Sequence, residues 1–333
     1  MPTKSATRVY RGTPRNLAML ARRLRAGELV AVPTETVYGL AANAFDSQAC
    51  EKIFAAKGRP ASDPLIVHIL SMRDLAHIAQ TNPAAEKLAR KFWPGPLTLV
   101  LHKHPDVPAV VSAGLPSVAV RMPAHPLFRR LLRLAGTPLA APSANPFGYV
   151  SPTTVEHVRA GLGGKIRHIL DGGPAQIGLE STIVDLRDPR KPRLLRPGAV
   201  TLAQLERVLR QKVAWRRKLS RTPECAGAQL APGLMARHYS PRTPVVLHGR
   251  IRATTALRHL GEAWVLAAKP PQRTGPNVFW LDARGDLRNG ARRLFAILRR
   301  LDSGRFSTIN VELAQGTGLA DAINDRLRRA AAR

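Results

Sequence analysis

The stretch AAKGRPASDPLIVHI, residues Ala55–Ile69, predicts a helix end, a turn and a strand, and this connection indicates the class of fold. Lys57 and Gly58 are typical of a helix end, because a basic residue in the last turn and a glycine after it both stabilise that end. The apolar run PLIVHI then predicts a strand. The turn between helix and strand carries two cations, Lys57 and Arg59. These cations either only stabilise the end of the helix or bind phosphate.

Similar helix and strand patterns occur on both sides of this stretch. Upstream, Thr13-Pro14 predicts a helix start and Gly27 its end, LVAVPT predicts a buried strand, and residues 47–56 predict a second helix. Further strand-and-turn patterns follow, several of them separated by helical patterns: PLTLVL, SVAVRMP, PLAAPSAN, HILDGG, STIVDL and PRLLRPG. Strands mixed with helices around Val-, Ile- and Leu-rich segments predict an α/β layer structure.

The pattern changes after residue 212. Residues 213–242 are rich in Pro, Gly, Ala and charge, which is typical of a linker. Beyond them, TPVVLHG, AWVLAA, NVFWL and STINVEL predict four strands of a small Rossmann-like α/β domain over residues 243–333. This segment has no GxGxxG motif, so it does not predict dinucleotide binding. We therefore expect a large α/β domain over residues 1–212, a linker over residues 213–242, and a small C-terminal domain over residues 243–333.

Composition limits the classes of protein. The chain has 333 residues with 52 Lys and Arg against 22 Asp and Glu, a net charge of +30. Either a polyanionic partner or an arginine-rich solvated surface explains that excess. The apolar runs are too short to span a bilayer and the N-terminus has no apolar signal region, so we expect no membrane association. Two distant cysteines, Cys50 and Cys225, fit a reducing cytoplasm.

Polar residues gather where the expected strands end. Thr34, Glu35 and Thr36 directly follow LVAVPT, and Arg121 ends SVAVR. Ligands of α/β sheets bind at the carboxyl ends of strands, although hydroxyls there are also ordinary turn residues. Arg121 is suited to bind a carboxylate in a bidentate pair, with a substrate or with an internal acid.

Two later segments add candidates of the same kind. APSANPFGYVSPT carries Ser143, Asn145 and Ser151, whose hydroxyl and amide groups suit phosphate oxygens. Ser151-Pro152 also predicts a helix start, and helix N-termini favour anions. DGGPAQIGLESTIVDL places Glu180, Ser181 and Thr182 at the start of a strand, after glycines that permit close backbone approach or a tight turn.

Common catalytic motifs are absent from the sequence. It has no GxxxxGK[ST] loop, no HExxH, no nucleophile elbow with its triad and no kinase signature. A reaction at these residues would therefore depend on positioning and electrostatic stabilisation.

Taken in order, the motifs resemble the YrdC-like family over most of residues 10–210. They are PTETVYGLAANA, KGRPASDPLIVHI, FWPGPLTLVL, VAVRMPAHP, APSANPFGYVSPT, DGGPAQIGLESTIVDL and LLRPGAV. The linker PGLMARHYSP and the small last domain are similar to the two-domain, threonylcarbamoyl-AMP synthase form of this family. The resemblance implies a YrdC-like twisted mixed sheet with helices, and synthesis of threonylcarbamoyl-AMP and pyrophosphate from L-threonine, bicarbonate or CO₂, and ATP with Mg²⁺.

The resemblance also implies residue roles. Lys57 and Arg59 would activate ATP, and the linker would fold over the site. ATP binding is implied for Lys57, Arg59, Asp63, Ser117, Ser143, Asn145, Ser151, Arg196 and Tyr239. Threonine binding is implied for Thr34, His68, Arg121, Ala141 and Ser181. Relatives often have Asn where this chain has Asp63. No residue is assigned as a metal ligand, because ATP phosphates and water can hold Mg²⁺.

The product would supply the threonylcarbamoyladenosine modification next to the tRNA anticodon. That role implies transient contact with the machinery that transfers the group to tRNA. The alternative function is a non-catalytic protein that binds double-stranded RNA or tRNA through its positive charge. Related domains also occur in hydrogenase-maturation enzymes, but this chain lacks their acylphosphatase-like and zinc-finger segments.

Overall fold

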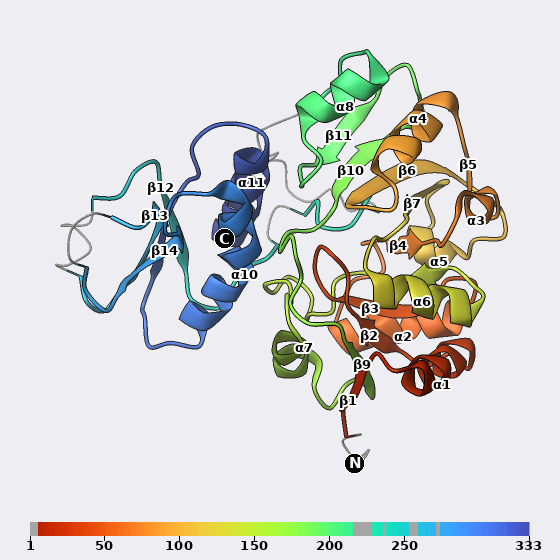
Figure 1. Cartoon of the computed structure of the whole chain (residues 1–333), viewed down its shortest axis with the longest axis horizontal. Coiled ribbons are helices and arrows are strands. Elements are labelled where there is room, and N and C mark those ends of the chain that lie inside the picture. The colour runs from red at the N-terminus through yellow and green to blue at the C-terminus, as the bar shows by residue number, and fades with distance from the viewer. Residues whose placement is uncertain (1–5, 216–227, 236–237, 253–258, 271–273, 333) are drawn as a thin grey trace.

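The computed structural model describes residues 6–215, 228–235, 238–252, 259–270 and 274–332. They form two units, each built on its own sheet (Figure 1). We call residues 6–215 the large-sheet unit and residues 243–332 the small-sheet unit. Helices α10 (Leu287–Asp302) and α11 (Leu319–Ala331) of the small-sheet unit lie on the side of its sheet that faces the large-sheet unit (Figure 1).

The large-sheet unit is built on an 11-stranded mixed sheet, with strand order β1-β9-β2-β3-β8-β4-β7-β6-β10-β11 and β5 paired with β6. The strands are β1 (Arg8–Arg11), β2 (Val30–Val32), β3 (Gly39–Asn43), β4 (Ile66–His68), β5 (Ala79–Gln80), β6 (Leu97–Lys103), β7 (Ser117–Arg121), β8 (Leu139–Ala140), β9 (His168–Asp171), β10 (Thr182–Asp185) and β11 (Arg193–Arg196). The mixed α/β sheet expected from the sequence is confirmed.

Helices cover both faces of this sheet. They are α1 (Pro14–Arg25), α2 (Ser47–Lys57), α3 (Met72–Ala76), α4 (Pro83–Phe92), α5 (Ala109–Ser112), α6 (Pro126–Ala135), α7 (Val155–Leu162) and α8 (Leu202–Leu209). Leu17, Leu20 and Leu24 of α1 pack with Phe128 and Leu131 of α6 in one core cluster against the sheet. A larger core contains buried residues of α2, α4 and α8. Both helix layers arise from apolar residues at helical spacing.

Strand direction gathers several strand ends at one place. β4 runs parallel to β7, with His68 opposite Arg121 at their carboxyl ends. β6 is antiparallel to β7, so Thr98 near its start also lies opposite Arg121. β10 is parallel to β6, and its first residue, Thr182, pairs with Leu97. The ends of β4 and β7 therefore meet the beginnings of β6 and β10.

The small-sheet unit has four parallel strands in the order β12-β15-β13-β14. They are β12 (Val245–His248), β13 (Ala263–Ala268), β14 (Val278–Asp282) and β15 (Ile309–Glu312), accompanied by α10 (Leu287–Asp302) and α11 (Leu319–Ala331). All four strands predicted from the sequence are present. Their parallel pairing with packed helices agrees with the expected Rossmann-like arrangement.

One predicted helix start is wrong. The sequence predicts that Ser151 caps a helix with Pro152 at its first position, but α7 begins at Val155. Its cap is Thr154, whose hydroxyl accepts a hydrogen bond from the His157 amide at 3.4 Å. Ser151 donates its hydroxyl to a carboxylate instead, so it is not available to cap the helix.

Two further expectations concern chain-wide features. Cys50 is a buried free thiol, whereas Cys225 lies outside the described residues. Among the helices of the described ranges, none has both the length and the apolar character needed to cross a bilayer.

Candidate active site

A cavity with about 480 Å³ of unfilled space, including its open mouth, lies where these strand ends meet. It is lined by residues of both the large sheet and the linker: Thr34, Thr36, Val37, Gly39, Arg59, Ile66, His68, Arg121, Ala141, Pro142, Ser143, Glu180, Ser181, Arg196, Pro232, Gly233, His238 and Tyr239. Three of them, Arg59, Arg121 and Arg196, are buried arginines. The cavity is therefore suited to anionic groups.

Arg121 is held at the end of β7 by three groups. Its Nε donates to the Gly95 carbonyl at 3.2 Å and its Nη1 to the Thr36 hydroxyl at 2.9 Å. Its Nη2 lies 2.6 Å from a Glu35 carboxylate oxygen. Burial works to raise the pKa of Glu35, but the charge and hydrogen bond of Arg121, together with backbone hydrogen bonds, outweigh it, so that pKa lies below its usual value. Each terminal nitrogen of Arg121 retains one further N–H, which leaves a fork for a ligand carboxylate.

Hydroxyl groups surround this fork. Thr34 follows β2, and its hydroxyl donates to the Val37 carbonyl at 2.6 Å while accepting the Thr36 and Val37 amides. The Ser181 hydroxyl lies 2.7 Å from the Thr98 hydroxyl across β10 and β6. These local hydrogen bonds hold the two hydroxyls in fixed positions on the cavity wall.

His68 lines the same cavity and is buried. Burial, assisted by the charge of Arg121, lowers its pKa to about 3, so the imidazole is neutral at physiological pH. Its ring packs 5.3 Å from the ring of Phe128, and its Nδ1 is buried without a hydrogen-bond partner among the described residues. A neutral imidazole is able to accept a hydrogen bond from a ligand ammonium group.

Lys57 and Arg59 occupy the turn after α2, as the sequence predicts. Gly58 ends the helix in the left-handed conformation, with φ +64°. The Lys57 Nζ donates to the carbonyls of Ser143 and Asn145, both at 2.5 Å. Burial and the neighbouring Arg59 lower the pKa of Lys57 well below its usual value, while Asp63 opposes that shift. Lys57 thus ties the turn to the Ser143–Asn145 segment.

Arg59 is paired with an acid inside the same turn. Its Nη2 lies 3.0 Å from a carboxylate oxygen of Asp63, and both side chains are almost completely buried. Its Nε and Nη2 also donate to the carbonyls of Asp63 and Pro64. Asp63 therefore fixes the direction of the Arg59 side chain and offsets part of its charge.

Arg196, the last residue of β11, connects the sheet to the linker. Its Nε and Nη2 donate to the carbonyl and hydroxyl of Ser181, and its Nη1 donates to the carbonyl of Pro232 at 3.0 Å. Tyr239 is buried beside it, and its pKa is raised mainly by burial. Four residues of the linker therefore form part of the cavity wall: Pro232, Gly233, His238 and Tyr239.

Nine of the fourteen residues to which the resemblance gives a binding role line the cavity: Thr34, Arg59, His68, Arg121, Ala141, Ser143, Ser181, Arg196 and Tyr239. Lys57, Asp63, Ser117, Asn145 and Ser151 do not, although Lys57 and Asp63 contact residues that do. Ser117 lies at the other end of β7, four residues before Arg121, with its hydroxyl buried. The Asn145 amide donates to the carbonyls of Pro146 and Tyr149 and so holds a turn.

Glu180 and His238 are cavity residues to which sequence reasoning gave no binding role, although Glu180 was named with Ser181 at the start of its strand. Each is directly next to an assigned residue, Ser181 and Tyr239. Neither the acidic side chain of Glu180 nor the imidazole of His238 in the linker gave a chemical reason to assign it to a ligand. Only the adjacency could have pointed to them.

The acidic groups near the cavity do not form a metal site. Within the described ranges there is no group of three or more His, Cys, Asp or Glu side chains placed to hold a metal ion. Glu35, Asp63 and Glu180 are each paired with an arginine.

Two family models together match nearly the whole chain. The model Sua5_yciO_yrdC, described as telomere recombination, matches residues 22–198. The model Sua5_C, described as the C-terminal domain of threonylcarbamoyl-AMP synthase, matches residues 200–332.

Individual relatives agree with these models. Threonylcarbamoyl-AMP synthase of Pyrococcus abyssi is 42% identical over 318 residues, covering 92% of this chain and 91% of the relative. The Bacillus subtilis protein of the same name is 41% identical over 329 residues, covering 95% and 92%. A crystal structure of Pyrococcus abyssi Sua5 complexed with L-threonine has a TM-score of 0.89 and 39% identity, and covers 98% of each chain.

Proposed function

The chain belongs to the Sua5–YciO–YrdC family and carries the C-terminal domain of the threonylcarbamoyl-AMP synthases, and we propose that it catalyses the reaction of those relatives. From L-threonine, bicarbonate or CO₂, and ATP it makes threonylcarbamoyl-AMP and pyrophosphate. The observation that carries this proposal is the convergence of Arg59, Arg121 and Arg196 on one cavity. Three buried guanidinium groups match a substrate pair with one carboxylate and a triphosphate.

Threonine fits the part of the cavity around Arg121. The free N–H groups of Arg121 bind its carboxylate as a fork, and Thr34 or Ser181 binds its hydroxyl. Ala141 forms part of the wall there. The neutral His68 imidazole accepts a hydrogen bond from the amine. A site that satisfies the hydroxyl discriminates strongly against analogues that lack it.

ATP occupies the part of the cavity between Arg59 and Arg196. Arg59 and Arg196 contact phosphate oxygens, Ser143 donates a hydroxyl, and Tyr239 closes over the nucleotide from the linker. Lys57 approaches from behind the Ser143–Asn145 segment, and Asp63 aims Arg59. The family resemblance alone supports three further ATP-binding residues: Ser117, Asn145 and Ser151. Mg²⁺ arrives with the ATP phosphates.

The reaction uses these cations without a covalent enzyme intermediate. The neutral amine of threonine adds to CO₂ and loses one proton to water, which gives a carbamate. A carbamate oxygen then attacks the α-phosphorus of ATP, and the bond to pyrophosphate breaks as the new P–O bond forms. Negative charge grows on the phosphoryl and leaving oxygens, where Arg59 stabilises it directly and Lys57 acts through the Ser143–Asn145 segment that it holds.

We further propose a separate role for each of three segments of the chain. Residues 1–212 form the catalytic domain, 213–242 the linker over the site, and 243–333 the small domain. The lining of the cavity by Pro232, Gly233, His238 and Tyr239 supports the linker role, because it excludes water from a labile product. The product then passes, in the cytoplasm, to the machinery that modifies tRNA next to the anticodon.

Pyrophosphate release tests the proposal. Purified protein with ATP and Mg²⁺ releases pyrophosphate only when both threonine and bicarbonate are present. Lys57→Ala lowers the rate about 10²- to 10³-fold, the cost of losing one preorganised group, because the Ser143–Asn145 segment loses the side chain that holds it.

Lys52→Ala is the matched control, since Lys52 is an exposed lysine of the same helix and donates only to the Gly27 carbonyl. Release that is indifferent to threonine would contradict the synthase function. RNA binding without ATP turnover, weakening steeply with salt, would then favour the RNA-binding alternative.

A further inference from the structure

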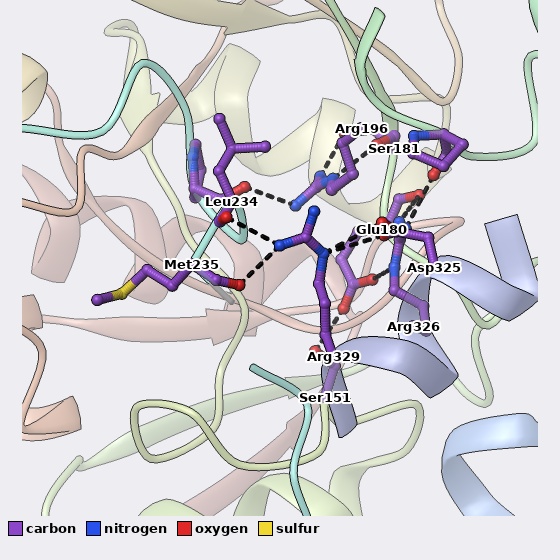
Figure 2. Close-up of polar contacts among 11 residues, drawn as sticks. Ser151, Glu180, Ser181, Arg196, Leu234, Met235, Asp325, Arg326 and Arg329 are labelled. Carbon is purple, nitrogen blue, oxygen red and sulfur yellow. Dashed lines mark hydrogen bonds and ion pairs between the residues drawn. The ribbon is translucent and has the colours of Figure 1, made fainter. Parts of the chain in front are cut away.

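Helix α11 of the small-sheet unit reaches the wall of the cavity through one fully buried arginine. The Arg326 Nε donates to a Glu180 carboxylate oxygen at 2.8 Å, and its Nη2 donates to the Glu180 carbonyl at 3.3 Å (Figure 2). Its Nη1 donates to the Pro197 carbonyl and to the carboxylate of Asp325. The side chain of Arg326 is 0% exposed. A buried guanidinium with this many partners has a fixed position.

Glu180 is shared between this arginine and the cavity. Its second carboxylate oxygen accepts the Ser151 hydroxyl at 2.5 Å (Figure 2). Glu180 lines the cavity, and the next residue, Ser181, is held by Arg196 through its carbonyl and hydroxyl. The carboxylate thus lies near a cation that the substrate phosphates need. In the present arrangement Arg326 and Ser151, not Arg196, hydrogen-bond with it.

The same helix holds the linker. The Arg329 Nη1 donates to the carbonyls of Leu234 and Met235 at 2.8 and 2.6 Å (Figure 2). Asp325 lies between the two arginines and accepts hydrogen bonds from both. The Arg326 guanidinium also stacks 5.3 Å from the centre of the Tyr239 ring. Arg326 therefore contacts two cavity residues, Glu180 from the sheet and Tyr239 from the linker.

We propose that Arg326 is a positioning residue of the ATP site, acting through Glu180 and Tyr239. This inference rests on the proposed function. Arg326 neutralises the Glu180 carboxylate and so leaves Arg196 available to phosphate. Without Arg326, Glu180 remains a buried anion, and Arg196 is a nearby buried cation with which it can pair. An Arg196 paired in that way is turned away from ATP, and Tyr239 loses the cation that holds its ring.

A double-mutant cycle measured by ATP binding without threonine tests this inference. Arg326→Gln weakens ATP binding about 10- to 100-fold, the range for losing a hydrogen bond to a charged group. Glu180→Gln in the same chain removes the anion that captures Arg196, so the double variant recovers most of the affinity. Arg328→Gln is the matched control, since Arg328 is an exposed arginine of the same helix and should leave ATP binding unchanged.

Steady-state kinetics separate positioning from folding. Arg326→Gln raises the KM for ATP more than the KM for threonine, and circular dichroism melts report how much folded protein each variant retains. Unchanged ATP affinity in Arg326→Gln would overturn the inference, as would a double variant at least as weak as the single one. Failure of the proposed function is a separate result: the wild type would release no threonine-dependent pyrophosphate, while the ATP-binding cycle would still report on Arg326.

Discussion

At the scale of single residues, two of the three buried arginines that line the cavity are paired with acids. Arg121 pairs with Glu35 and Arg59 with Asp63. His68 has no such partner, and burial makes its charged form unfavourable. Burying an unpaired charge costs several kcal/mol, so a histidine at this position stays neutral.

His68 makes the protein sensitive to acid. Its pKa in the folded state is about 3, against 6.5 for the unfolded chain. Below pH 6.5 the unfolded chain therefore binds a proton that the folded protein does not, and stability falls as the pH falls towards 3. The loss is at most about 1.4 kcal/mol of unfolding free energy per pH unit, or about 2 kcal/mol between pH 6.5 and pH 5.

His68→Gln should remove that part of the acid sensitivity. Urea unfolding of the ligand-free protein at pH 6.5 and pH 5 measures it, with wild type as the reference. The lowered pKa values of His125, His157 and His238 keep part of the acid sensitivity in the variant. An equal loss of stability in both proteins would show that His68 is protonated, or solvated, in the folded state.

Some residue roles could be predicted from sequence and others could not. Arg59, Arg121 and Ser181 were found because they stand at strand or helix ends, where sheet topology gathers ligand groups. The pairing of Arg121 with Glu35 was left open, because a sequence does not say whether an arginine binds a ligand or an internal acid. Ser151 was misread because a Ser-Pro pair favours a helix start locally, whereas the Glu180 carboxylate that holds its hydroxyl lies 29 residues away.

At the scale of elements, the linker depends on a glycine. Gly233 has φ +77°, and an added Cβ would lie 2.5 Å from the Tyr239 hydroxyl and 2.9 Å from Arg196 Nη1. Both the left-handed backbone and the close approach therefore require glycine. Residue-by-residue propensity predicts only a loop in this segment. The close approach of linker to sheet follows from contacts across the cavity.

Gly233→Ala should displace Tyr239 and Arg196 from the cavity wall. We expect the KM for ATP to rise about 10-fold or more, because Arg196 loses the geometry of a charge-assisted hydrogen bond. Gly249→Ala is the control, since an added Cβ there meets no atom within 4 Å and its φ is not in the left-handed range. If Gly233→Ala kept the wild-type KM for ATP, the linker wall would not contribute to nucleotide binding.

At the scale of the whole molecule, the two units share a hydrophobic core. Val37, Val150 and Leu179 of the large-sheet unit pack in one cluster with residues of α10 and α11. Both units were predictable, since their strands and helices follow from local periodicity. Their contact was not, because residues such as Glu180 and Arg326 are 146 positions apart and carry no local signal of pairing.

Part of the high arginine content is explained by arginines buried at the cavity and at the contact between the two units. Six arginines are buried in the described ranges, namely Arg59, Arg121, Arg196, Arg299, Arg326 and Arg329. Three line the cavity, and the other three reach from α10 and α11 towards the large-sheet unit or the linker. Part of the positive charge thus lies inside the protein. Neither an arginine-rich solvated surface nor a polyanionic macromolecular partner is needed to explain that part.

The shared core and these arginines predict cooperative unfolding of the two units. Arg299 of α10 donates to the carbonyls of Val150, Ser151 and His157, and although burial lowers its pKa to about 10 it remains charged at pH 7. A buried apolar interface with satisfied polar groups couples units that would otherwise move independently. Differential scanning calorimetry of the wild type should show one transition, with equal calorimetric and van't Hoff enthalpies.

Arg299→Met should weaken that coupling by about 3 kcal/mol, because it leaves the three carbonyls without their charged donor. The expected result is a lower melting temperature and a transition that broadens or splits in two. Arg293→Met, at an exposed position of the same helix, serves as the control and should melt like the wild type. Two separate transitions already in the wild type would show that the units unfold independently, and the small-sheet unit could then hold neither the linker nor Glu180 in place.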